Sequence, residues 1–319
     1  MGWHVDGAAA YSRPLALLWR RETASMTGTR AARRPASIGA MYLGLLLPSS
    51  LLAQDLGGMP PMGAAAGVSA TRPPADSLRT AEQVRVYLAR VPQGEIPDLS
   101  GLDLNGLDLR GVDFRKANLT RAMLNGARLD SANLFSCDLT DAIATGASFT
   151  AANMDVSTLR RANLQRAQFR KASLFATILE AADLREADLR ETRIIGSLRK
   201  ANLAGAVLSG ANIGADPGNQ SMGVMRAQFG NADLTGADLS GANLFKADFS
   251  FATLTGANLS RADLRNADLV ATDFTRADLS DANLAAADIG GAIFTGAKGI
   301  ATVKGLEQTR NRNQARFDH

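Results

Sequence analysis

Aspartate recurs in this sequence at a spacing that could bring carboxylates together. In the stretch NADLTGADLSGANLFKADFS (231–250), an Asp or Asn stands at every fifth position. If residues twenty apart lie side by side, Asp248, Asp268 and Asp288 form a row spaced about 4.8 Å apart. Such a row could bind a cation weakly or form an acidic stripe. We interpret it as a solvated surface ladder, because each Asp would approach a cation from one side and no other oxygen cage is apparent.

The residues that most often carry catalysis are scarce. The only histidines are His4 and His319, at opposite ends of the chain, and the only cysteine is Cys137. Cys137 stands where most repeats have Ala, so we expect it to face the core and be inert. The sequence has no GxxxxGK[ST] phosphate loop, no GxGxxG after a strand and no HExxH. We therefore expect no enzyme activity, no metal site and no cofactor.

Basic and aromatic residues provide the other candidate surface. Four basic residues fall near one edge of the expected fold, but acidic residues such as Glu180 are interspersed among them. Mixed charge favours a solvated face over a footprint for nucleic acid or lipid. Aromatic residues at exposed corners can mark a partner site, although scattered rings can also be ordinary. The candidate interaction surface comprises Arg160, Arg161, Arg199, Lys200, Phe135, Phe175, Phe245, Asp248, Asp268 and Asp288.

A repeat of five residues must position all of these side chains. A large apolar residue, here called the centre of a unit, stands at every fifth position from Leu99 to Phe294. The phase slips by one residue at Leu198 and returns at Phe229. We count 38 units; the centre is Leu, Ile, Phe or Met in all but one (Ala144), and Ala stands two positions before it in 28. Repetition this strict cannot arise from composition.

The period of five predicts a short strand followed by a corner. Residues two apart on a strand face the same side, so the Ala and the centre point inward and the Asp or Asn between them points outward. The other two residues must turn the chain, because an odd repeat in a straight strand would put alternate centres on opposite faces. Stacked units form a solenoid in which neighbouring coils bury the centres, at roughly 1.5–3 kcal/mol for each Leu.

The pattern A(D/N)LXX, as in NADLT, GADLS and GANLF, resembles the pentapeptide repeat family over residues 97–298. This resemblance implies an all-β fold, a right-handed quadrilateral β-helix with four units per coil. The best-understood members of that family mimic B-form DNA and bind DNA gyrase through a strongly acidic rod. Residues 98–298 carry about 23 acidic and 21 basic side chains. This near-neutral balance argues against DNA mimicry.

Two irregularities and two flanks complete the predicted organisation. The segment RIIGSLRK (193–200) lacks one residue and should distort one corner, and residues 214–221 should leave the coil as a loop. Residues 77–96 should form a capping helix and a lead-in, with Thr80 and Gln83 as a capping box. We expect the tail 299–319 either to cover the last coil or to fray.

The first 53 residues are typical of a secretory signal peptide. Arg30, Arg33 and Arg34 precede a short apolar run that ends near Ala53. A basic start, an apolar stretch and a small residue at the cleavage point are its three parts. A start at Met26 would give a signal of ordinary length, and our hypothesis is that residues 1–25 are not translated in the cell. Residues 54–76, rich in Gly, Pro and Ala, are interpreted as a flexible linker.

These observations favour a non-enzymatic, exported scaffold, periplasmic or secreted, that binds another protein or the cell envelope. The alternative is a cytoplasmic DNA mimic that binds and protects gyrase. The partner is an unknown protein; we do not expect nucleic acid, and we expect membrane contact only through an uncleaved N-terminal anchor. A homodimer is left open.

Overall fold

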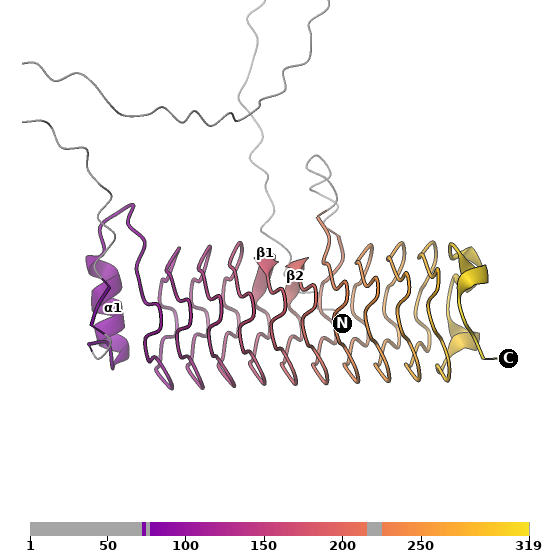
Figure 1. Cartoon of the computed structure of the whole chain (residues 1–319), viewed down its shortest axis with the longest axis horizontal. Helices are drawn as coiled ribbons and strands as arrows, with labels where there is room; N and C mark the ends of the chain where they lie inside the picture. Colours follow the sequence, from indigo (N-terminus) through magenta and orange to yellow (C-terminus); the bar gives the residue numbers. More distant parts are fainter. Residues whose placement is uncertain (1–71, 75–76, 216–224, 319) are drawn as a thin grey trace, which may run out of the picture. The chain divides into compact units, whose positions relative to one another are not determined.

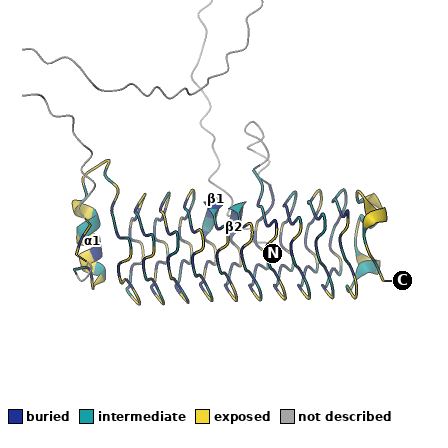
Figure 2. Cartoon of the chain, viewed as in Figure 1, coloured by how far each residue is buried: buried dark blue, intermediate teal, exposed yellow. Residues whose placement is uncertain are grey.

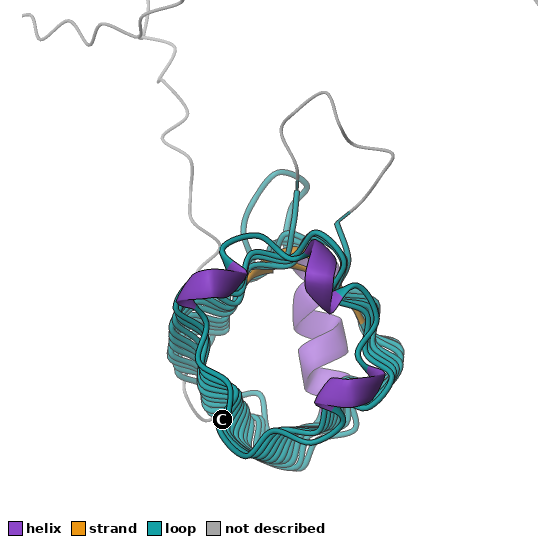
Figure 3. Cartoon of the chain, turned by 90° about the vertical axis from the view of Figure 1, so that its right-hand side faces the viewer, coloured by secondary structure: helices purple, strands orange, loops and turns teal. Residues whose placement is uncertain are grey.

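The described part of the chain winds into a β-solenoid. The computed structural model describes residues 72–74, 77–215 and 225–318. The predicted signal peptide, the alternative start at Met26 and most of the linker lie outside these residues. Backbone bridges join residues twenty apart, as from Asp98 to Asn118 and on to Asp138, so each coil holds four five-residue units (Figures 1 and 3). The period of five therefore corresponds to one quarter of a coil.

Each unit pairs with the next coil through the same three backbone bonds. The Leu99 N–H donates to the Asn118 carbonyl at 2.8 Å, and the Asn118 N–H donates to the Pro97 carbonyl at 2.8 Å. The third bond runs between corners, from the Gly101 N–H to the Thr120 carbonyl at 2.8 Å. The second corner residue of the regular units has a positive φ, such as 61° at Lys116. This left-handed conformation is most easily adopted by Gly, which explains why Gly is frequent there.

The core is a narrow column of centres and alanines. Leu164 and Ala162, for example, are fully buried, and Figure 2 shows buried residues in coil after coil. The rings of Phe149 and Phe169 stack with centroids 5.0 Å apart, about one strand spacing. The inward direction predicted for the Ala and the centre is confirmed.

The outward Asp and Asn residues shape the corners. The Asp98 carboxylate accepts the backbone N–H of Ser100 at 3.0 Å, two residues later, and the same bond recurs in most units. The expected ladder bonds also form, as from Asn118 Nδ2 to Asp98 Oδ1 at 3.2 Å and from Asn258 Nδ2 to Asp238 Oδ1 at 3.1 Å. The ladder follows from the sequence pattern, whereas the bond within each corner was not predicted from it.

Both irregularities fall on the corner between the fourth and first units of a coil. At the one-residue deletion, strands β1 (Ser173–Ile178) and β2 (Arg193–Ser197) pair in parallel, and the bridge step shortens to 19 residues, as from Asp183 to Asn202. Ile195, at this corner, is buried and only 2% exposed. The step then lengthens across residues 214–225, of which 216–224 lie outside the described residues.

The N-terminal end of the coil is covered by helix α1 (Ala81–Arg90) (Figure 1). Its capping box is present: the Thr80 hydroxyl accepts the Gln83 N–H, and the Gln83 side chain accepts the Thr80 N–H. Val84 is fully buried against the first coil. The helix begins at Ala81, within the segment 77–96 where it was expected. No helix among the described residues is long and apolar enough to cross a membrane.

The tail continues the coil with longer steps. In the tail the bridging residues are six apart instead of five. The bridges join Asp278 to Lys298, Asn283 to Lys304, Asp288 to Arg310 and Ile293 to Arg316. The extra residue is taken up by short 3₁₀ turns, η2 (Ile300–Thr302), η3 (Leu306–Gln308) and η4 (Arg312–Gln314). Of the two outcomes expected for the tail, covering the last coil is the one observed.

Candidate interaction surface

The ten candidate residues border one side of the coil. We call this side the first face and define it by its outward column, which runs by successive bridges from Asp98 through Thr158, Ser197 and Asp248 to Arg310. The basic residues follow this face in each coil, at what we call the basic edge (Arg160, Arg161, Arg199, Lys200). The aromatic residues precede it, at the aromatic edge (Phe135, Phe175, Phe245). They share a face but are spread along much of its length, so they form no single compact site.

The three aspartates form the predicted row. Asp248 bridges to Asp268 and Asp268 to Asp288, so their carboxylates project from consecutive coils. Each accepts the backbone N–H two residues later, at 3.0, 3.3 and 3.1 Å. Asp248 is only 8% exposed. Part of each carboxylate is therefore already used to hold its own corner.

Two arginines, Arg226 and Arg310, partly offset the charge of this row, a role that was not predicted from the sequence. Arg226 Nη2 lies 3.5 Å from Asp248 Oδ2 and 4.0 Å from Asp268 Oδ2, and Arg310 Nη1 lies 3.9 Å from Asp288 Oδ2. Arg226 stands two residues before Gln228, which bridges to Asp248, and Arg310 follows steps of six residues. The period of five gives the columns, but it does not show how far an arginine side chain reaches across them. Among the described residues, no three His, Cys, Asp or Glu side chains are placed to hold a metal ion.

The basic edge is half paired and half unpaired. Arg160 Nε donates to Glu180 Oε2 at 3.2 Å, and Arg161 donates to both oxygens of Asp141 at 2.8 and 2.7 Å. These hydrogen bonds lower the pKa of Asp141 below its usual range. Within the described part of the chain, Arg199 and Lys200 have no ion-pair partner. The mixed-charge interpretation therefore holds for Arg160 and Arg161, whereas Arg199 and Lys200 are two unpaired cations further along the same edge.

The aromatic edge carries rings that are covered by cations. The guanidinium of Arg193 lies 4.5 Å from the ring centroid of Phe175. Lys246 Nζ lies 5.3 Å and the Arg265 guanidinium 5.7 Å from the ring centroid of Phe245. Phe135 is 37% exposed. Cation–π contacts of this kind hold a ring at the surface and give it a positive rim.

Cys137, the one thiol, is unsuited to catalysis. It is 1% exposed, and its Sγ donates to the Phe114 carbonyl at 3.0 Å. Burial raises the pKa of the thiol to about 12, so no nucleophilic thiolate forms at neutral pH. His4 and His319 lie outside the described residues.

The repeats match a known family model. The model for pentapeptide repeats matches eight copies, over residues 98–135, 132–170, 152–191, 225–261 and 257–296. Together these ranges cover just over half of the chain. No curated protein matches the sequence.

Several solved structures are similar to the chain. HetL, a pentapeptide repeat protein involved in heterocyst differentiation regulation from the cyanobacterium Nostoc sp. strain PCC 7120, is 28% identical over 74% of this chain and 94% of its own, with a TM-score of 0.24. A pentapeptide repeat protein from the Arabidopsis thaliana thylakoid lumen is 36% identical over 30% of this chain and 59% of its own, with a TM-score of 0.26. QnrB1, a plasmid-mediated fluoroquinolone resistance protein, is 21% identical over 62% of this chain and 93% of its own, with a TM-score of 0.35. These TM-scores are low, so the family assignment depends on the repeat match alone.

Proposed function

The chain belongs to the pentapeptide repeat family, and from this premise we propose that it is a non-enzymatic scaffold that binds another protein through the first face. One observation carries the proposal. In every coil the backbone groups and the buried side chains serve to stack one coil on the next. The two edges of the first face, by contrast, hold the unpaired cations Arg199 and Lys200 and rings covered by cations, such as Phe175. A rigid array of Arg and aromatic side chains is the composition that protein interfaces favour.

The same residues argue against the DNA-mimic alternative. Mimicry of a phosphate backbone needs a continuous excess of free carboxylates. Here each carboxylate of the row formed by Asp248, Asp268 and Asp288 has an arginine partner, Arg226 or Arg310, which offsets most of its charge. Elsewhere Asp108, Asp183 and other carboxylates are held by the Arg two residues later. We therefore favour a partner that recognises Arg and Phe side chains.

Site-specific photo-crosslinking tests the proposed face. A benzophenone amino acid placed at Phe135 or Phe175 should crosslink one protein partner in cells that make the full chain. The matched control is the same amino acid at Gln168, whose outward column runs from Asp108 through Ser148 to Asp188 and lies two units away from the first face, across the core. Equal crosslinking from both sides, or none from Phe135 and Phe175, would contradict the proposal. A crosslinked species of twice the chain mass would identify a second copy of the chain as the partner.

The right-handed sense of the coil also stays a prediction.

We propose export of the chain from the sequence of residues 30–53. Cell fractionation of a C-terminally tagged chain, with N-terminal sequencing of the product, tests export. We expect a chain that begins near Gln54 outside the cytoplasm. An intact chain in the cytoplasm would contradict export and would make a supercoiling assay with gyrase the next experiment.

A further inference from the structure

The first coil has a backbone edge that α1 covers only in part. Further along the coil, the outward residue of each unit bonds to the coil before it, as Asn133 does through both its N–H and its carbonyl, at 2.9 and 2.8 Å. In the first coil α1 takes over some of these bonds. The Asp98 N–H donates to the Tyr87 hydroxyl at 3.1 Å, and Arg85 Nη2 donates to the Asp108 carbonyl at 3.2 Å.

The fourth unit of this coil lacks such cover. Three backbone groups of this unit form no hydrogen bond to any described residue: the N–H of Asp113, the carbonyl of Asp113 and the carbonyl of Arg115. Their counterparts one coil later, in Asn133 and Phe135, are all bonded. An unpaired strand edge of this kind is a template for a further strand.

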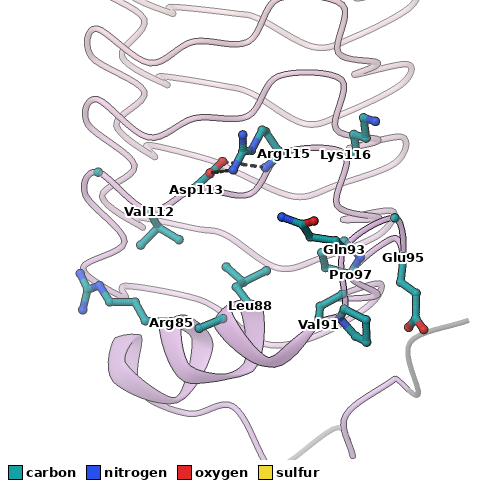
Figure 4. Close-up of a pocket in the computed structure, with 14 residues that line it drawn as sticks. Arg85, Leu88, Val91, Gln93, Glu95, Pro97, Val112, Asp113, Arg115 and Lys116 are labelled. Atoms are coloured by element: carbon teal, nitrogen blue, oxygen red, sulfur yellow. Dashed lines mark hydrogen bonds and ion pairs between the residues drawn. The ribbon is translucent and has the colours of Figure 1, made fainter.

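A cleft of about 640 Å³ lies directly beside this edge (Figure 4). The strand of residues 112–116 forms one wall, and α1 with the segment 91–97 forms the other. Leu88 and Val112 supply apolar side chains, and Gln93 extends between the two walls (Figure 4). The cleft therefore offers apolar contact next to unpaired main-chain groups, which is the combination that binds extended peptides.

We propose that this edge binds an extended segment of a partner protein, which adds a strand parallel to residues 112–116. The coil itself supplies the register. On the side of the next coil, the Val112 carbonyl accepts a backbone bond, and the N–H groups of Phe114 and Lys116 each donate one. A bound segment would repeat this pattern on the other side of the strand: its first carbonyl accepts from the Asp113 N–H, its third N–H donates to the Asp113 carbonyl, and its fifth N–H donates to the Arg115 carbonyl.

The same register predicts the side chains of the segment. Its first and third residues face inward, toward Leu88 and Val112, so a small residue followed by an apolar one fits best. Its second residue lies beside Asp113, which already accepts Asn133 Nδ2 at 3.0 Å, so Asn suits that position. Its fourth residue lies beside Arg115 and Lys116. Arg115 Nη2 lies 2.6 Å from Asp113 Oδ2, whereas Lys116 has no ion-pair partner among the described residues. Lys116 therefore favours an acidic residue at the fourth position of the segment, although Glu95 also lines this cleft.

The test uses the full chain and the peptide acetyl-Ala-Asn-Leu-Glu-Gly-amide, which has this pattern and no terminal charges. Titration is followed by NMR of the backbone amides and by fluorescence anisotropy of a labelled peptide. We expect saturable binding that shifts the Asp113 amide and slows its hydrogen exchange. The Asp103 amide, an edge group of the first coil that does not line the cleft, should not respond.

Two matched pairs separate main-chain recognition from nonspecific contact. N-methylation of the peptide Leu removes the N–H that would bond to the Asp113 carbonyl and should weaken binding about tenfold. N-methylation of the peptide Glu, whose N–H donates no bond to the protein in this register, should have a smaller effect on affinity. In the protein, Leu88→Lys should abolish binding, whereas Val86→Lys, at an exposed position of the same helix, should not change it.

Three results would overturn the proposal. The first is absence of binding up to about 1 mM peptide. The second is equal affinity of the two N-methylated peptides, which would show that the edge is not used. The third is slow exchange of the Asp113 amide without peptide, which would show that the chain's own N-terminal residues occupy the edge. The cleft lies at the end of the coil, so this test and the crosslinking test of the first face can fail independently.

Discussion

The coils before the deletion and the coils after the insertion share one backbone but differ at their corners. In the first region, residues 98–191, arginines join neighbouring coils through carboxylates, as from Arg161 to Asp141 at 2.7 Å and from Arg166 to Glu186 at 2.8 Å. In the second, residues 226–296, most corners hold Thr, Ser or Gly. The backbone bond from Leu164 to Asp183 nevertheless has the same length, 2.7 Å, as that from Leu254 to Asp273.

The two regions together show that the corners do not determine the fold. The pairing of coils depends on the inward residues and on the outward Asp or Asn that caps each corner, and both are common to the two regions. Corner side chains can therefore vary without loss of the solenoid, which leaves them available for recognition. Substitutions at four kinds of position test this conclusion.

The largest effect is expected in the core, and it should be equal in both regions. Leu164→Asp and Leu254→Asp each place an unpaired charge among fully buried side chains. Each should lower the free energy of unfolding by about 4 kcal/mol or more. Chemical denaturation measures this, with Asn163→Asp as the control, because that side chain points outward. A tolerated Leu164→Asp would refute the assigned register.

The next effect should be confined to the irregular corner. A Cβ at Gly196 would lie 2.1 Å from the Thr177 carbonyl oxygen, so Gly196→Ala should destabilise the chain by about 1–3 kcal/mol. Gly230 is the matched control in a regular corner, since the nearest atom to its Cβ would be 3.6 Å away. Thermal melting of the two variants should differ clearly. Equal melting temperatures would mean that the deletion is accommodated in another way.

A smaller effect is expected from the charged corners of the first region. The hydrogen bonds from Arg161 lower the pKa of Asp141, so Arg161→Gln should raise that pKa toward its ordinary value. A carboxylate with a lowered pKa in the folded state adds stability above its ordinary pKa, and this stability is lost as the pH falls through the lowered value. The original chain should therefore lose more stability than the variant as the pH falls below about 4.

NMR titration of the Asp141 carboxyl carbon measures the shift directly. Arg276→Gln is the control from the second region, because Arg276 has no ion-pair partner among the described residues. Both charged groups at the Arg161–Asp141 pair are exposed, so the change in stability should be small and should disappear in high salt. If the Asp141 pKa does not move in Arg161→Gln, the ion pair does not form in solution.

The smallest effect is expected at an outward Asp. Asp263 accepts the Arg265 backbone N–H at 3.2 Å and two bonds from the Arg265 side chain, at 2.8 and 2.7 Å. Asp263→Asn keeps the acceptor for the backbone bond and loses only an exposed ion pair, so the cost should be below about 0.5 kcal/mol. Asp263→Ala removes the corner bond as well and should cost more. Equal costs for the two variants would show that the corner bond contributes nothing to stability.

Much of the fold could be predicted because every coil repeats one local rule. The inward Ala and centre, the outward Asp or Asn and the two corner residues all follow from strand geometry and a period of five. The deletion at 193–200 was also visible, because it shifts the phase. The second corner residue's left-handed conformation and the cap that each Asp forms on its corner required the structure, since several side-chain bonds are compatible with the same pattern.

The candidate surface could be predicted only in part. The sequence placed Phe135, Phe175 and the Asp row at corners and in columns, because residues twenty apart align whenever the register is regular. It could not assign Arg226 and Arg310 to that row, because Arg310 follows steps of six and because the period does not show where the long side chain of Arg226 points. The sequence also showed no sign of the cation–π contacts, in which Arg193 covers the Phe175 ring and Arg265 the Phe245 ring.

The sequence alone specifies four features of this protein: the repeat, the buried column of Leu and Ala, the inward position of Cys137 and the phase shifts. Each depends on which side of a short strand a residue faces. The folded coil was needed to show which carboxylates have arginine partners, which cations are unpaired and which edge groups α1 leaves open. These depend on distances between side chains and chain ends that lie one or more coils apart. A local period sets the stacking of the coils, but it does not specify how long side chains meet across them.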